Sequence, residues 1–319
     1  MSNRYRAGWG LGLVFLVLLG AACPALSTGL EAVRERGVLR HIGVEPYAKC
    51  VASSQEGLSI EVIQQFARWL GVEYQFVPTQ WPNALGDLLG GDVYFDQKNG
   101  TRVQAGRPIT GDVLCSGVTA LRWRSEVVAF SHPTFLTQVL LVTRSDFRVT
   151  PIRPSGSASS DIKKTKGKIA GLRLMGVPGT CLDPEMYALQ GAGAELVAGA
   201  AHPNQLVPRL LAGEVEAILL DVPSALMGLG HWPGQLKIIG PVSSIQYMAC
   251  AFRPQDEALR HAFNRFMEEI RWNGTYYRMV ERYYPSIFNY FPHFFANIAP
   301  EKQLPNDSFN MLSFPGSRW

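Results

Sequence analysis

The first third of the chain alternates between segments with strand periodicity and segments with helix periodicity. In SIEVIQQFARWLG, residues 59–71, the apolar positions recur at helical spacing, with Ser59 suited to cap the start and Gly71 the end. A buried strand is predicted before it, at 38–44, and the alternating pattern of VEYQFVP after it predicts another. Strand, helix and strand in this order predict a parallel α/β layer.

A second α/β unit is predicted beyond residues 151–168, a segment rich in Pro, Ser, Gly and Lys that is typical of a linker. Its strands are expected in IAGLRLMGV and VEAILL, and its helices in NQLVPRLLAG and from Asp183 and Pro184 onward. Apolar residues from Leu259 to Ile270 then share one face of a long predicted helix. The pattern predicts two α/β units joined by a polar crossover.

The N-terminus has the pattern of a secretory signal peptide. Arg4 and Arg6 precede LGLVFLVLLGAA, an apolar run of 12 residues that is too short to span a membrane. We therefore expect a signal peptide at 1–22 and a periplasmic location. Cys23 follows a segment that resembles a lipoprotein cleavage box, although the leucine lies one position too far from it, so a lipid anchor at Cys23 stays open.

Composition and motifs exclude several classes of function. The 319 residues are 47% hydrophobic and 18% charged, which suits globular domains, and the net charge of +4 comes without the clustered basic residues of a nucleic-acid-binding protein. There is no GxSxG motif and no P-loop, and GAGAEL at 191–196 fails the dinucleotide-binding pattern at its last position. These absences argue against an enzyme without excluding one, because a lone carboxylate can act as an acid or base, and the expectation is a protein that is not an enzyme.

The cysteine and histidine spacing indicates no metal site and no cofactor, since neither CxxC nor HExxH occurs. Cys50, Cys115, Cys181 and Cys250 follow the predicted signal peptide and Cys23. Because an exported protein folds in an oxidising compartment, they could form disulfides or stay as buried thiols, and the sequence leaves both open.

Several segments, taken in chain order, resemble bacterial periplasmic solute-binding proteins of the polar amino acid ABC uptake systems (family 3, type II periplasmic-binding fold). The resemblance covers roughly residues 30–285 and is nearly without gaps. The segments that carry it are RERGVLRHIGVE, EGLSIEVIQQFARWLG, GDVLCSGVTALRWRSEVVAFSHPTF, KGKIAGLRLMGVPGT, LLAGEVEAILLDVPSAL and QYMACAFRPQDEALRHAFNRFMEEIRWNGTYYRMVERYYP. Each motif is weak alone; their order and number make the set specific.

The resemblance implies an α/β protein of two lobes with a cleft between them and two hinge strands, near FLTQVLLV and QYMACAF. The expected divisions are lobe 1 at 30–137 and 252–295, lobe 2 at 138–251, and a C-terminal tail at 296–319. The aromatic residues of IFNYFPHFF are expected to pack on the body of the protein.

The resemblance also assigns a ligand site residue by residue. Arg124 corresponds to the arginine that grips the ligand's α-carboxylate, and Gly117 and Thr119 to small residues that contact the ligand through backbone and hydroxyl. Thr180 corresponds to a threonine at a helix start in lobe 2, and Asp221 to the aspartate that pairs with the α-ammonium. Physical chemistry suits these roles, because a guanidinium binds a carboxylate with two hydrogen bonds and helix N-terminal N–H groups favour the same negative end.

Two further positions match the family less closely. Glu45 falls where the family often has a second acid, and Trp81 where it has an aromatic wall. Leu121 replaces a residue that is often hydroxylated, and Leu220 lies where some relatives have a polar side chain. The ligand's side chain therefore stays open.

Each assignment has a purely structural alternative. An arginine after a strand is often a solvated surface group, and Asp221 could simply cap a helix. Trp81 could belong to the core, and Glu45 could face water.

Two features depart from the resemblance or go beyond it. Residues 92–109 form an insertion whose role the sequence does not reveal. Cys50 and Cys115 both map near the cleft side of lobe 1, where a disulfide between them is a hypothesis.

The function that these expectations favour is an exported solute-binding protein. It would capture an amino acid or similar small zwitterion and deliver it to an ABC permease in the inner membrane. One alternative is an exported accessory or sensing module with the same fold that binds a protein partner. Another is an enzyme like the periplasmic dehydratases that resemble these binders.

Overall fold

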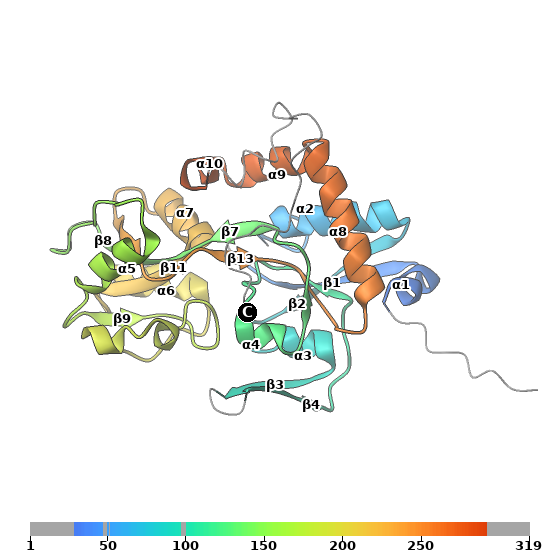
Figure 1. Cartoon of the computed structure of the whole chain (residues 1–319), viewed down its shortest axis with the longest axis horizontal. Helices are drawn as coiled ribbons and strands as arrows, with labels where there is room; N and C mark the ends of the chain where they lie inside the picture. The colour runs from blue at the N-terminus through green and yellow to red at the C-terminus, as the bar shows by residue number, and fades with distance from the viewer. Residues whose placement is uncertain (1–28, 47–49, 51, 97–99, 292–319) are drawn as a thin grey trace, which may run out of the picture.

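The computed structural model describes residues 29–46, 50, 52–96 and 100–291. They form two lobes side by side, and between the lobes run two strands, β7 (Phe135–Thr137) and β13 (Gln246–Met248) (Figure 1). These strands pair antiparallel with each other, with Thr137 opposite Gln246. The two-lobe α/β fold with two hinge strands is confirmed. The predicted signal peptide at 1–22, Cys23 and the tail at 296–319 lie outside the described residues.

Lobe 1 is built on a five-stranded sheet with the order β2-β1-β5-β14-β6. Strand β1 is parallel to β2 and to β5, whereas β14 is antiparallel to β5 and to β6. The strands are β1 (Val38–Val44), β2 (Glu73–Thr79), β5 (Val113–Leu114), β6 (Ala129–Phe130) and β14 (Ala251–Phe252). The helices are α1 (Leu30–Arg36), α2 (Leu58–Leu70), α3 (Ala84–Leu89), α4 (Arg122–Ser125), α8 (Glu257–Trp272), α9 (Thr275–Tyr283) and α10 (Ile287–Tyr290).

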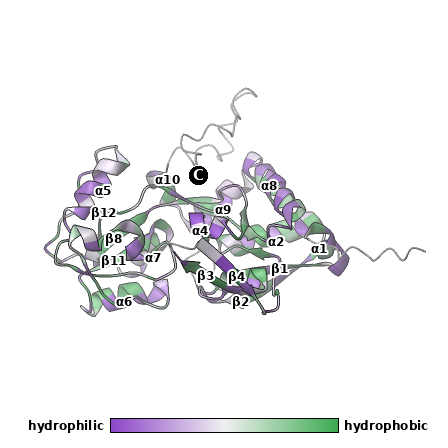
Figure 2. Ribbon diagram, turned by 60° about the horizontal axis from the view of Figure 1, so that its bottom comes forward, coloured by the Kyte–Doolittle hydropathy of each residue, from purple (hydrophilic) through white to green (hydrophobic). Residues whose placement is uncertain are grey.

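Helix α2 shows how the sequence encodes this lobe. Its predicted C-terminal residue Gly71 has a left-handed φ of 75°, which only glycine adopts without strain, and its N–H bonds the carbonyls of the last turn. The predicted cap Ser59 instead lies inside the helix, which begins after Gly57. The apolar face of α2 packs on α8, where the Phe66 ring lies 5.2 Å from that of Phe263. Figure 2 shows hydrophobic and hydrophilic residues alternating along α8, as one buried face requires.

Lobe 2 is built on a second five-stranded sheet with the order β10-β9-β11-β8-β12. Its strands are β8 (Val139–Arg144), β9 (Arg173–Met175), β10 (Glu195–Leu196), β11 (Ala217–Asp221) and β12 (Leu236–Pro241). Its helices are α5 (Ala158–Lys166), α6 (Leu206–Leu211) and α7 (Val222–His231), with 3-10 turns η1 (Pro184–Tyr187), η2 (Gln190–Ala192) and η3 (Pro203–Gln205). β11 is parallel to β9 and antiparallel to β8.

Two local predictions in lobe 2 were wrong. Part of the predicted linker is helix α5, which begins because the Ser157 side chain accepts from the N–H of Ser160. Conversely, Asp183 and Pro184 start only the short turn η1 in place of a helix. Polar composition hid the first of these elements, because its stabilising contacts are side-chain caps and not a long apolar face.

In the insertion at 92–109, β3 (Gly91–Asp96) pairs antiparallel with β4 (Gly100–Ala105), and the two strands lie below α3 and α4 in Figure 1. The Phe95 ring stacks on Trp123 of α4, 5.3 Å between centroids. Arg107 binds Asp87 of α3 at 2.7 Å. The strand pair is thus anchored beside α4, the helix that carries Arg124. Within the described range, no helix has the length and apolar character that crossing a membrane would demand.

Candidate ligand-binding site

A small cavity lies where the two lobes meet. Lobe 1 contributes Trp81, Gly117, Thr119 and Arg124, and lobe 2 contributes Thr180, Cys181, Leu182 and Pro203. The free space is about 10 Å³, room for roughly one water molecule. The structure therefore brings five of the seven predicted site residues together, in a cleft closed on its own side chains.

The wall from lobe 1 is a binding loop, residues 116–120, that follows β5. Gly117 has a left-handed φ of 65°, which a residue with a Cβ rarely adopts. The Ala120 N–H donates to the carbonyl of Tyr247, and the Ala249 N–H donates to the carbonyl of Val118. The loop is thereby bonded to the hinge strand β13 and to the residue that follows it.

Arg124 is the charged group of this cavity. It lies on α4 and is only 4% exposed. Its Nη1 donates to the Thr119 carbonyl at 3.0 Å, and its Nη2 donates across the cleft to the Gly179 carbonyl at 3.3 Å. The guanidinium carbon also lies 5.0 Å from the centre of the Trp123 ring. Burial strengthens the interaction of such a cation with an anion, because water no longer screens the pair.

The wall from lobe 2 is the turn around Thr180. The Thr180 hydroxyl donates to the Val177 carbonyl at 2.8 Å and accepts from the Leu182 N–H at 3.0 Å. The helix start expected at Thr180 is not there, because η1 begins four residues later and Asp183 caps it. Burial, with a contribution from the nearby Asp221 carboxylate, raises the pKa of the Cys181 thiol to about 12, so this cavity group stays neutral at physiological pH.

Asp221 and Glu45 are predicted site residues that do not line the cavity. Asp221 is fully buried at the end of β11, where it caps α7 by accepting from the Ser224 N–H at 2.9 Å. Glu45 is exposed after β1, and its Oε1 accepts from the Ser54 N–H. Asp221 thus caps a helix and Glu45 faces solvent, and the ligand roles expected of them stay predictions.

Sequence reasoning did not single out Leu182 and Pro203. Leu182 lies two residues from Thr180, so its proximity could have suggested it. Pro203 opens η3, whose capping box of His202 and Gln205 positions it, and nothing local in the sequence indicates that it reaches the cleft. Beside it, the Asn204 side chain donates across the cleft to the Pro46 carbonyl at 3.1 Å.

Comparison with known families agrees with this geometry. Residues 96–286 match the model of the bacterial extracellular solute-binding proteins, family 3. The chain belongs to this family. A family 3 protein of this kind has a solute-binding fold, which accounts for the two lobes and for a cavity between them.

Solved structures share the fold of this family 3 chain. The P235GK mutant of ArgBP from T. maritima is 23% identical, with a TM-score of 0.62, and is covered over 99% of its length by 80% of this chain. The ancestral amino acid-binding protein AncCDT-1, a precursor of cyclohexadienyl dehydratase, is 18% identical with a TM-score of 0.61 over 80% of this chain and 98% of its own.

Similar proteins of known name correct the expectation that this protein is not an enzyme. Membrane-bound lytic murein transglycosylase F of Desulfosudis oleivorans is 25% identical over 72% of this chain and 44% of its own length. The protein of the same name from Pseudomonas syringae pv. syringae is 25% identical over 87% of this chain and 51% of its own. The chain spans about half the length of these relatives. They are named as enzymes, so the expectation of a protein that is not an enzyme is contradicted.

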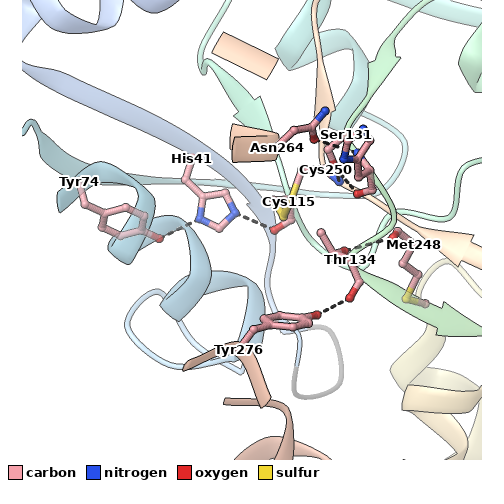
Figure 3. Close-up of a disulfide and its surroundings, with 10 residues drawn as sticks. His41, Tyr74, Cys115, Ser131, Thr134, Met248, Cys250, Asn264 and Tyr276 are labelled. Carbon is pink, nitrogen blue, oxygen red and sulfur yellow. Dashed lines mark hydrogen bonds between the residues drawn. A yellow bond between two sulfur atoms is a disulfide. The ribbon is translucent and has the colours of Figure 1, made fainter. Parts of the chain in front are cut away.

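The cysteine pairing behind the binding loop also differs from the hypothesis. The disulfide joins Cys115 to Cys250, with Cα atoms 4.4 Å apart (Figure 3). Cys50 and Cys181 are buried thiols. Ala251 pairs with Leu114 in the antiparallel register of β14 and β5, so the two bonded cysteines lie directly opposite each other. The proposed Cys50–Cys115 pair was therefore wrong. The disulfide ties the start of the binding loop to the chain just after the second hinge strand.

His41 lies next to this disulfide on β1 and is fully buried. Its Nε2 is bonded to the Cys115 carbonyl at 2.7 Å, and its Nδ1 to the Tyr74 hydroxyl at 2.9 Å (Figure 3). Burial lowers the pKa of His41 from 6.5 to about 4, only partly opposed by the bond to Cys115. The folded protein therefore holds this ring neutral where the unfolded chain would protonate it.

We expect this ring to make the protein acid-sensitive. Because the folded pKa is the lower one, the stabilisation is complete above about pH 6.5 and is lost as the pH falls toward 4, by up to about 1.4 kcal/mol per pH unit. Urea unfolding from pH 7 to 4 measures this loss. The His41→Gln variant controls for carboxylates and should show a shallower decline, whereas an equal decline in both proteins would contradict the assignment.

Proposed function

We propose that this chain captures a small carboxylate-bearing solute between its lobes, with Arg124 binding the carboxylate. The observation that supports it is the buried guanidinium of Arg124, which bonds carbonyls of both lobes inside the interlobe cavity. Amino acids are the first candidates, because a solved neighbour is an amino acid ABC transporter substrate-binding protein from Streptococcus pneumoniae bound to L-arginine. Delivery to an ABC permease in the bacterial envelope would complete the role.

Closure of the lobes would couple to binding. The cavity leaves about 10 Å³, so a solute can enter only if the lobes separate about β7 and β13. Arg124 reaches the Gly179 carbonyl directly. A ligand carboxylate would take over this contact and add contacts of its own to both walls, and differential contacts of this kind bias a two-lobe protein toward the closed state.

A thermal-shift screen of the chain against amino acids, organic acids and amines tests the proposal. A ligand at 100 times its Kd adds about 2.7 kcal/mol of stability, which raises Tm by about 4 °C in a protein of this size. We expect the stabilising compounds to carry a carboxylate. Stabilisation by amines alone would contradict the role given to Arg124.

We also propose a second candidate, in which the same site senses a solute for a cell-wall-lysing protein. The names of the curated relatives favour it, together with their similarity over 72% or more of this chain. Murein fragments in the same thermal-shift assay, and the turbidity of a murein suspension incubated with the chain, distinguish the candidates. A response to murein favours sensing or lysis, and a response to free amino or organic acids alone favours uptake.

A further inference from the structure

A second cavity borders the binding loop of lobe 1. Leu58 and Val62 of α2 line it, together with Phe135 of the hinge strand β7 and Met248 of the hinge strand β13. Each of these four side chains is no more than 5% exposed. The free space is about 20 Å³, against about 10 Å³ in the interlobe cavity. Gly117 belongs to both linings, so the two cavities are neighbours.

Three polar side chains of the second cavity have partners in the protein. The Thr134 hydroxyl donates to the Met248 carbonyl at 3.1 Å, and the Tyr276 hydroxyl donates to the Thr134 carbonyl (Figure 3). The Cys50 thiol contacts the Tyr284 hydroxyl at 3.4 Å. These groups need no hydrogen bond from a ligand, whereas the four buried apolar side chains can contact one.

Two ionised groups act on the second cavity from outside its lining. Burial, with a smaller contribution from the Asp221 carboxylate, raises the pKa of the Cys50 thiol to about 12, so the thiol is neutral at pH 7. The Arg271 guanidinium carbon lies 5.5 Å from the centre of the Tyr276 ring. The opposite charges of Asp221 and Arg271 act against each other on a charged group placed in the cavity. Ser59 adds a neutral hydroxyl to the lining.

This lining bears on which solute side chain fits. An apolar chain end is stabilised there by leaving water, whereas a hydroxyl or ammonium group loses hydration that the lining replaces only in part. The space admits a chain end of about one or two carbon atoms, since it holds little more than one water molecule. At the shared wall, Gly117 has no side chain to separate this space from the site of Arg124.

We infer that the second cavity takes the end of the solute's side chain, so that the site selects acids with a short, unbranched apolar side chain over acids with a hydroxylated or cationic one. This inference rests on the proposed binding of the solute's carboxylate by Arg124. The chain end would also contact Phe135 and Met248, one residue from each hinge strand.

Matched ligands test the inference by calorimetric titration at pH 7 and fixed salt. L-norvaline is expected to bind about tenfold or more tightly than L-homoserine, in which a hydroxyl replaces the last methyl group, and L-norleucine similarly more tightly than L-lysine. From L-alanine through L-2-aminobutyrate to L-norvaline, each added CH₂ should raise the affinity about fourfold. Pentanoate and 4-hydroxybutanoate repeat the first comparison without the α-ammonium group.

The outcomes separate the inference from the function beneath it. If L-homoserine or L-lysine binds as tightly as its apolar counterpart or more tightly, the inference is overturned while the carboxylate-binding function stands. If none of these amino acids and organic acids binds, the proposed function itself fails and the inference falls with it.

Variants of the cavity wall give an independent test. Val62→Ala enlarges the second cavity, so the ratio of L-norleucine affinity to L-2-aminobutyrate affinity should rise about fivefold or more. Val62→Leu narrows the cavity and should lower the same ratio by a similar factor. Val33→Ala is the matched control, because it truncates a fully buried valine of α1 that lines neither cavity.

The control should keep the ratio within about twofold of the unchanged protein, since distant core substitutions act independently. If Val62→Ala and Val33→Ala give the same ratio, the inference is overturned. Should neither Val62 variant fold, the matched ligands decide alone.

Discussion

Replacing Arg124 with glutamine is expected to lower the affinity for a carboxylate ligand about 30-fold or more, because truncating one member of a buried charge pair costs about 2–5 kcal/mol. The loss of affinity is large because Arg124 is buried. The same pair of guanidinium and carboxylate at an exposed position would contribute about 1 kcal/mol or less. Glutamine can still donate to one of the two carbonyls that Arg124 binds, so the cleft keeps part of its closure contact. Calorimetric titration with the best ligand of the screen measures the effect.

The chain offers a matched control on the same helix. Arg122 is exposed two residues away, so Arg122→Gln removes the same charge without touching the cavity. Its affinity should stay within about twofold of the unchanged protein, since exposed charges act weakly through screened solvent. Urea midpoints of both variants exclude unfolding as the cause. Equal losses in the two variants would mean that net charge, and not the cavity, governs binding.

The sequence predicted the fold well because periodic burial is a local property. The apolar face of α2 and the stop at Gly71 can both be seen in a single window of the chain. The family resemblance assigned the site roles of Gly117 and Thr119, and the segment that carries this part of the resemblance is also a single window of the chain, between β5 and α4. Features that depend only on residues close together in the sequence could therefore be predicted without knowing which distant segments are in contact.

The features that the sequence did not predict depend on contacts between segments far apart in the chain. The partner of Cys115 is set by the register of β14 against β5, which no spacing in the sequence reveals. Pro203 reaches the cleft because η3 is positioned by the packing of lobe 2. Asp221 illustrates an ambiguity of chemistry: an aspartate at a strand end before Val-Pro-Ser suits a ligand contact and a helix cap equally, and the structure shows the cap.

Removing the disulfide with the double substitution Cys115→Ala and Cys250→Ala is expected to lower the free energy of unfolding by about 2–5 kcal/mol. The bond closes a loop between positions 135 residues apart, and the loss of chain entropy in the unfolded state grows with loop length. Both cysteines are buried at the edge of the lobe 1 sheet, Cys115 just after β5 and Cys250 just before β14, so alanine also leaves a small cavity. Urea unfolding with and without a thiol reductant measures the change.

The response to reductant separates the disulfide from ordinary core packing. The unchanged protein should lose stability in reductant, and the double variant should not respond, because it has no bond left to break. Cys50→Ala is the matched control: it removes a buried thiol that contacts the Tyr284 hydroxyl at 3.4 Å but leaves the disulfide intact, so it should keep the full response. If the unchanged protein unfolds at the same urea concentration with and without reductant, the disulfide does not stabilise it.

The double variant should also bind its ligand more weakly, because Cys115 directly precedes the binding loop that holds Gly117 and Thr119.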